Sequence, residues 1–245
     1  MMTDGERDLA VRTLRAGDVV AFPTETVYGL GADARNADAV RRVFALKGRP
    51  SNNPLIVHVA DIEMARTVVR TWTPHAMELA TRHWPGPLTL VLERTDGIPD
   101  VVTGGGSTVA VRCPDHPAAL ELLRAFGGPL VAPSANLSGT ISPTTAAHVR
   151  AAFEDVLVLD GGPCRAGIES TVVSLIDAPP RVLRPGALPP EQLGIGTDAA
   201  PPTQGGPLPS PGMLDRHYAP RTPLHLFDDR SGVGVEHARP GIVIK

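Results

Sequence analysis

The chain has 245 residues, of which 42% are hydrophobic and 20% charged, with a formal net charge of −3 and a pI near 6.2. This length and composition predict one large α/β domain, alone or with a small appendage, and the acidic balance excludes a general basic field for nucleic acid. Aromatic residues make up only 4% of the chain, which argues against a stacking platform for single-stranded nucleic acid.

The same composition indicates where the protein works. The two cysteines, Cys113 and Cys164, have no CxxC spacing, which favours a reduced environment. No apolar run approaches the length of a membrane span, and the charged N-terminal segment lacks the apolar core of a signal peptide. We therefore expect a cytoplasmic protein with no membrane contact.

The hydrophobic pattern predicts helices alternating irregularly with short strands. Up to residue 112 we expect, in chain order, a helix at 6–16, a strand at 18–22, a helix at 36–46, a strand at 55–60, helices at 61–70 and 73–84, and strands at 88–92 and 108–111. Beyond it we expect a helix at 117–126, a strand at 130–132, a helix at 142–153, strands at 156–159, 171–176 and 181–183, and a helical turn at 191–193.

Two features of this pattern bear on the fold. Residues 23–33, PTETVYGLGAD, are too rich in Thr and Gly to be all helix or all strand. The strands at 88–92 and 108–111 have no helix between them. The pattern therefore predicts a mixed, twisted β-sheet flanked by helices, not a strict βαβ repeat.

The domain organisation follows from a change in composition. Residues 5–196 are expected to form the main domain. Residues 197–220 are rich in Pro and Gly and are predicted to be a linker. Residues 221–245, with strand-like segments at 224–227 and 241–245, are expected to be a stub of a C-terminal domain.

Residues 47–58, KGRPSNNPLIVH, are the strongest candidate for a functional segment. Lys47 and Arg49 stand at a predicted helix end, a Ser-Asn-Asn-Pro turn follows, and His58 closes an apolar run. Two cations, small polar side chains and an imidazole beside a buried strand predict a site for an anionic ligand.

Other segments could converge on the same site. Arg112 and Arg184 fall at predicted strand ends, where α/β sheets place ligands. Ser142-Pro143 has the pattern of a helix start, which would add free backbone N–H groups and a favourable dipole for an anion. Standard nucleotide-binding motifs and Cys/His metal-ligand spacings are absent, so no resident metal site is expected.

Each residue also has a structural explanation. His58 alone is more typical of a buried core histidine, Lys47 could simply complement the helix dipole, and arginines at strand ends are more often in surface ion pairs. The residues alone therefore predict no more than a phosphate- or carboxylate-binding α/β enzyme.

A set of longer motifs adds to this prediction. In chain order they are PTETVYGLGAD, KGRPSNNPLIVH, WPGPLTLVL, TVAVRCPDHP, APSANLSG, GIESTVV and LRPG. Together they resemble the threonylcarbamoyl-AMP synthase family of YrdC-like proteins, over roughly residues 5–195. SPGMLDRHYAP resembles the linker motif of the longer members of the family, in which a C-terminal domain follows. Here that domain is expected to be truncated or missing.

The resemblance implies a fold and a reaction. The fold would be a YrdC-like twisted mixed sheet flanked by helices, with a concave ligand site. The enzyme would be an L-threonylcarbamoyladenylate synthase, a nucleotidyltransferase that makes threonylcarbamoyl-AMP and pyrophosphate from L-threonine, bicarbonate and ATP with Mg2+. The product would serve threonylcarbamoyl modification of tRNA adenosine 37 through downstream tRNA-modification proteins.

The resemblance also implies roles for residues of this chain. The L-threonine pocket would comprise Thr26, His58, Arg112, Ala132 and Ser170. The ATP contacts would come from Arg49, Asn53, Thr108, Ser134, Ser142, Arg184 and Tyr218. Lys47 and Arg49 would be the catalytic pair that meets the phosphates and bicarbonate, and Asn136 and Ser138 would line the site.

Two alternatives remain at this point. A YrdC-like domain could act as an RNA-binding module, although the acidic pI and the few aromatic residues leave only weak RNA binding open. A carbamoyl-adenylate-forming domain of the hydrogenase-maturation type shares these motifs, but it normally stands in a much longer chain with acylphosphatase and zinc-finger segments. Neither segment is visible in the sequence given.

Overall fold

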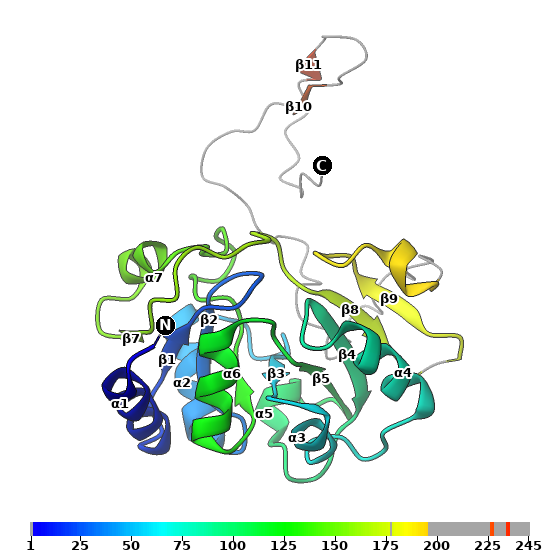
Figure 1. The fold of residues 1–245 in the computed structure, drawn as a ribbon, viewed down its shortest axis with the longest axis horizontal. Helices are drawn as coiled ribbons and strands as arrows, with labels where there is room; N and C mark the ends of the chain where they lie inside the picture. The colour runs from blue at the N-terminus through cyan, green and yellow to red at the C-terminus, as the bar shows by residue number, and fades with distance from the viewer. Residues whose placement is uncertain (1, 177, 196–225, 228–233, 236–245) are drawn as a thin grey trace.

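The computed structural model describes residues 2–176, 178–195, 226–227 and 234–235. Its centre is a twisted nine-stranded sheet in the order β7-β1-β2-β6-β3-β5-β4-β8-β9 (Figure 1). In chain order the strands are β1 Val20–Phe22, β2 Gly29–Asp33, β3 Ile56–His58, β4 Leu88–Glu93, β5 Thr108–Arg112, β6 Leu130–Val131, β7 Leu157–Val158, β8 Thr171–Ser174 and β9 Arg181–Arg184. The pairs β1–β7, β3–β5 and β4–β8 are parallel and the others antiparallel, which confirms the predicted mixed sheet.

Helices cover the sheet from both sides. They are α1 Asp4–Arg15, α2 Ala37–Lys47, α3 Ile62–Arg66, α4 Pro74–His83, α5 Asp100–Thr103, α6 Pro117–Phe126 and α7 Ala146–Ala152, followed by the 3-10 turn η1 Pro190–Leu193. Helices α1 and α6 pack side by side, and their apolar faces share one core with Val20, Phe22 and Leu130 of the sheet (Figure 1). Helices α2, α4 and α7 contribute to a larger core with the side chains that point the opposite way, such as Val57 and Val111.

The alternation of side chains along β3 and β5 determines which face of the sheet carries His58 and Arg112. Val57 and Val111 point into the larger core, so their neighbours point to the other face of the sheet. There Ile56 and Ala110 form a small apolar cluster with residues of β4 and β8. His58 and Arg112 continue this face one step further along each strand and are direct partners in the parallel register. The buried strand predicted at 55–60 thus brings His58 beside an arginine.

Two predicted helices are wrong in their bounds. The helix expected at 142–153 begins at Ala146, with Thr145 as its N-cap, so Ser142 does not begin a helix. The Ser142 hydroxyl instead donates to the Glu169 carboxylate, 3.1 Å away. The helix expected at 61–70 ends at Arg66, because the chain returns to the sheet and forms a bridge with residue 94.

The glycine-rich segment that the pattern left unassigned contains strand β2, Gly29–Asp33, which lies between β1 and β6. A Cβ at Gly31 would lie 2.6 Å from the ring of Phe22, so glycine is needed there for packing. The short helix α5 was not predicted either.

Part of the C-terminal prediction can be compared with the structure. Of the strand expected at 224–227, Leu226–Phe227 forms β10, which pairs with β11 Gly234–Val235. The predicted linker and the strand expected at 241–245 lie outside the described residues. Among the helices that are described, none is both long and apolar enough to cross a lipid bilayer.

Candidate active site

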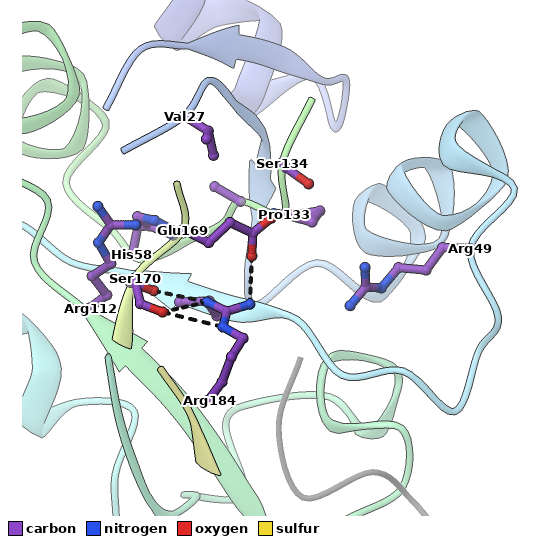
Figure 2. Close-up of a pocket in the computed structure, with 11 residues that line it drawn as sticks. Val27, Arg49, His58, Arg112, Pro133, Ser134, Glu169, Ser170 and Arg184 are labelled. Atoms are coloured by element: carbon purple, nitrogen blue, oxygen red, sulfur yellow. Dashed lines mark hydrogen bonds and ion pairs between the residues drawn. The ribbon is translucent and has the colours of Figure 1, made fainter. Parts of the chain in front are cut away.

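A pocket opens on the face of the sheet that carries His58 and Arg112 (Figure 2). It has an empty volume of ≈ 420 Å³ including its open mouth. The residues that line it come from β3, β5, β9 and the loops beside them, and they are Val27, Arg49, Ile56, His58, Arg112, Ala132, Pro133, Ser134, Glu169, Ser170 and Arg184.

Arg112 is the buried cation at one end of this pocket. Its Nη2 donates to Glu25 Oε1 at 2.6 Å and to Thr26 Oγ1 at 2.8 Å, and only 3% of the residue is exposed. The Thr26 hydroxyl is itself placed by the turn between β1 and β2, where Thr24 Oγ1 lies 2.8 Å from it and donates to the carbonyl of Val27. A guanidinium held in this way is prepared to bind a carboxylate.

His58 lies beside Arg112 as a neutral imidazole. Burial, and then the positive charge of Arg112, lowers the pKa of His58 to about 3. Its ring packs edge-on against Phe22, and within the described part of the chain its buried Nδ1 has no hydrogen-bond partner. A neutral histidine offers a ligand one donor or one acceptor without adding charge.

A second ion pair, between Arg184 and Glu169, forms another part of the pocket wall. Arg184 Nη1 donates to Glu169 Oε2 at 2.5 Å, while Arg184 Nη2 donates to the backbone oxygen and the hydroxyl of Ser170 (Figure 2). The Ser170 hydroxyl also lies 2.8 Å from that of Thr89. Arg184, Glu169 and Ser170 are therefore fixed relative to one another.

Arg49 stands across the pocket from this group (Figure 2). Its guanidinium donates to the Asn53 side chain at 2.7 Å and to the backbone oxygens of Asn53 and Pro54. These bonds close the predicted Ser-Asn-Asn-Pro turn around the arginine. The pocket thus presents arginines from three separate segments, which suits a ligand with more than one anionic group.

Lys47 points to a loop beside the pocket and is not among the pocket-lining residues. Its Nζ donates to the backbone oxygens of Ser134 and Asn136 and lies 3.4 Å from Asn136 Oδ1. The backbone oxygen of Lys47 accepts from the N–H of Ser138. Lys47 therefore holds the loop that carries Ser134, and it does so from the end of α2.

The structure brings most of the predicted site residues together. Those that line the pocket are His58, Arg112, Ala132, Ser170, Arg49, Ser134 and Arg184. Thr26, Asn53 and Ser142 lie one contact behind them, on Arg112, Arg49 and Glu169 respectively. Thr108 is not brought to the pocket: it begins β5, four residues from Arg112, or roughly 13 Å along an extended strand. Tyr218 lies outside the described residues.

The sequence assigned no role of their own to Glu25 and Glu169, although both lie in loops at predicted strand ends. Both belong to motifs quoted above, PTETVYGLGAD and GIESTVV. Each glutamate stands next to a Thr or Ser that was predicted to bind a ligand, and this was the signal that could have identified it. The ion pairs themselves could not be predicted, because in each case the arginine partner lies more than ten residues away in the sequence.

The contacts of Lys47 lead to a pH-dependent prediction. Burial, and then the charge of Arg49, lowers the pKa of Lys47 from its ordinary value of 10.5 to about 7. Between these pH values the unfolded chain keeps the lysine proton and the folded chain has lost it, so the folded state is favoured more as the pH rises. We expect the difference in unfolding free energy between the wild-type protein and Lys47→Met to rise through this window, as measured by urea unfolding. A difference that stays constant would mean that the carbonyl acceptors keep the pKa near its ordinary value.

Comparison with known proteins finds two matching family models. The Sua5/YciO/YrdC family, described as "Telomere recombination", matches residues 12–186, and a domain described as "Threonylcarbamoyl-AMP synthase, C-terminal domain" matches residues 180–239. The threonylcarbamoyl-AMP synthases of Pyrococcus abyssi and Bacillus subtilis are 48% and 49% identical over 86% and 89% of this chain. The chain spans 65% and 66% of their lengths, slightly less than two thirds.

A solved structure gives the same result for the fold. The crystal structure of P. abyssi Sua5 complexed with L-threonine has a TM-score of 0.82 and 44% sequence identity, and the match covers 90% of this chain and 67% of that one. The resemblance inferred from the motifs is therefore confirmed, and the chain belongs to the Sua5/YciO/YrdC family.

Proposed function

We propose that this chain carries the active site of an L-threonylcarbamoyladenylate synthase, which makes threonylcarbamoyl-AMP and pyrophosphate from L-threonine, bicarbonate and ATP. The observation that carries the proposal is the division of one pocket into two ends. Arg112 and neutral His58 stand at one end, and Arg49 and Ser134 stand across it. Such a pocket suits an amino acid and a polyphosphate that must react with each other.

The amino-acid end would bind L-threonine. Arg112 would receive the carboxylate, and His58 would hydrogen-bond the hydroxyl or the carboxylate. Thr26, Ala132 and Ser170 would complete this pocket, because the Thr26 hydroxyl accepts from Arg112, while Ala132 and Ser170 line the pocket. The complex of the related P. abyssi Sua5 with L-threonine supports this assignment.

The other end would bind ATP. Arg49 and Ser134 line this end and would contact the nucleotide, which would extend across the pocket to Arg184, with Asn53 and Ser142 supporting these contacts. Thr108 and Tyr218 remain proposed ATP contacts from the family resemblance alone. Arg49 would neutralise the phosphates and bicarbonate, and Lys47 would act with it by holding the Ser134 loop.

Magnesium would enter as the complex with ATP. Among the residues that the structure describes, no group of three or more His, Cys, Asp and Glu side chains is arranged to hold a metal ion. Mg2+ usually takes only one or two carboxylates together with phosphate and water oxygens. Glu169, the carboxylate that lines the pocket, is the side chain in a position to add to those ligands.

The chemistry would need no protein nucleophile. The free threonine amine attacks the carbon of bicarbonate, and loss of water leaves a carbamate. A carbamate oxygen then attacks the α-phosphorus of ATP, and pyrophosphate leaves. Catalysis would come from holding the reactants in line and from neutralising negative charge, which is what fixed arginines and buried hydroxyls provide.

The product would serve threonylcarbamoyl modification of tRNA adenosine 37, with downstream tRNA-modification proteins as partners and at most weak direct binding of RNA. We place the reaction in the cytoplasm. The free thiols of Cys113 and Cys164 are consistent with a reducing compartment.

An omission assay tests the proposal. Purified protein is supplied with Mg·ATP, bicarbonate and L-threonine, and pyrophosphate release is followed with each reactant left out in turn. We expect release only when all are present. Release that does not depend on threonine would overturn the proposal. Release driven by carbamoyl phosphate would favour the hydrogenase-maturation type of chemistry, and salt-sensitive RNA binding without turnover would favour an RNA-binding module.

A further inference from the structure

Glu25 is a buried acidic residue to which the proposed function gives no role. It is 4% exposed and does not line the pocket. Its carboxylate oxygens nevertheless have separate partners: Oε1 accepts from Arg112 Nη2 at 2.6 Å, and Oε2 accepts from the backbone N–H of Asp115 at 3.0 Å. Burying a carboxylate costs free energy unless a positive charge compensates it, and here Arg112 provides that charge. Because both oxygens of Glu25 are also hydrogen-bonded, its position against Arg112 is well defined.

The contacts of Arg112 show which edge of the guanidinium is occupied. A guanidinium has five N–H donors. The Nε–H points to the backbone oxygen of Gly86 at 3.4 Å, and the two Nη2 protons go to Glu25 and Thr26. Within the described part of the chain, Nη1 has no partner, and it is not among the fully buried unpartnered atoms. The Nη1 protons are therefore the ones that open onto the pocket.

The backbone of Glu25 ties this arrangement to a second loop. Its carbonyl oxygen accepts from the N–H of Ala166 at 2.9 Å, in the segment that leads to Ser170. Through its side chain and its backbone, Glu25 thus joins the turn after β1, the end of β5 and the 161–170 loop. All of these segments contribute to the amino-acid end of the pocket.

We propose that Glu25 is a positioning residue for substrate recognition: it holds the Nη2 edge of Arg112 so that the Nη1 edge meets the carboxylate of the amino acid. This inference rests on the proposed function, in which Arg112 binds that carboxylate. Without Glu25 the arginine keeps its charge but loses its fixed direction, and part of the binding free energy must then be spent on ordering it. The loss should be confined to ligands that carry the carboxylate.

Isothermal titration of the full chain with L-threonine and with L-threoninamide, which lacks the carboxylate charge, tests this role. For the wild-type protein we expect threonine to bind about 30-fold more tightly than the amide, the size of effect typical of a hydrogen bond to a charged group. For Glu25→Gln we expect threonine to weaken about tenfold and the amide less than threefold, so the ratio falls from about 30 to roughly 3–9. Asp115→Asn is the matched control, because it removes an exposed carboxylate bonded to Arg165 but keeps the backbone N–H that Glu25 uses, and its ratio should stay at the wild-type value.

The outcomes separate this inference from the function it rests on. Wild-type protein that binds neither ligand, or both equally, would overturn the proposed role of Arg112 and with it this inference. If the wild-type protein prefers threonine over the amide and Glu25→Gln keeps the same preference, the positioning role alone is overturned. This holds whether the variant weakens both ligands equally or neither. Tighter threonine binding by Glu25→Gln would mean that Glu25 competes with the substrate, which also contradicts it. If Glu25→Gln does not fold, Glu25→Asp, whose carboxylate is one methylene shorter, must lower the same ratio.

Discussion

Replacing Arg112 with Met is expected to weaken L-threonine binding by about 100-fold or more and ATP binding by less than about threefold, since a buried guanidinium–carboxylate contact is among the strongest polar contacts. The reason is the separation of the two ends of the pocket, because Arg112 and Arg49 come from different elements and face it from opposite sides (Figure 2). Arg49→Met is the mirror variant, for which ATP binding should weaken and threonine binding should not. Titration calorimetry with each ligand measures both.

The same substitution has a consequence for stability that must be separated from binding. Arg112→Met leaves Glu25 as a buried charge without its partner, and breaking a buried pair in this way costs about 3–5 kcal/mol. The double variant Arg112→Met/Glu25→Gln removes that charge and should recover much of the unfolding free energy without recovering threonine binding. Equal losses of threonine and ATP affinity in a well-folded double variant would contradict the role of Arg112.

Gly186→Ala is expected to lower kcat/KM by about 100-fold or more and to destabilise the fold by about 1–3 kcal/mol, because added volume at a closed position must displace its neighbours. A Cβ at Gly186 would lie 2.5 Å from Ser170 C and 2.6 Å from Ser170 O, and it would also meet the backbone oxygen of Glu169. All of these are backbone atoms, so no side-chain rotation relieves the clash. The segment that carries two pocket residues would have to move.

Gly97→Ala is the matched control for this prediction. The Cβ there would meet only Thr95 Oγ1, at 3.8 Å, which is ordinary contact. Steady-state kinetics and urea unfolding of the two variants should therefore differ sharply. Wild-type activity in Gly186→Ala would mean that the Glu169–Ser170 segment can shift without consequence for the pocket.

Much of the fold could be predicted because its strands are short, apolar and bounded by turn residues. The strands at 55–60, 88–92 and 108–111 were found from apolar runs alone, and all belong to the central sheet. The predictions were wrong where a tertiary contact outweighed the local sequence preference. Ser142-Pro143 has the composition of a helix start, but the Ser142 hydroxyl finds Glu169, and the helix begins after Thr145. Strand β2 was missed because its glycines are required by close tertiary contacts, Gly31 with the ring of Phe22 and Gly29 with Ala132.

The sequence could predict which residues belong to the site. It could not predict which of them contact one another. Motifs identified Arg112 and Arg184, but neither motif says which carboxylate pairs with which arginine. The Arg184–Glu169 pair depends on the strand order, which places β8 next to β9. The Arg112–Glu25 pair forms because the turn between β1 and β2 meets the end of β5. Lys47 shows the same limit: its place in the sequence suggested a phosphate ligand, whereas its nitrogen is bound to loop carbonyls.

The central claim is that one pocket joins threonine, bicarbonate and ATP, and isotope labelling tests it most directly. The protein is incubated with 13C-bicarbonate, Mg·ATP and L-threonine, and the adenylate product is analysed by mass spectrometry. We expect the wild-type protein to form threonylcarbamoyl-AMP that carries one 13C atom, and Arg112→Met to form much less of it. An adenylate without the label, or a labelled product formed equally well by Arg112→Met, would contradict this claim.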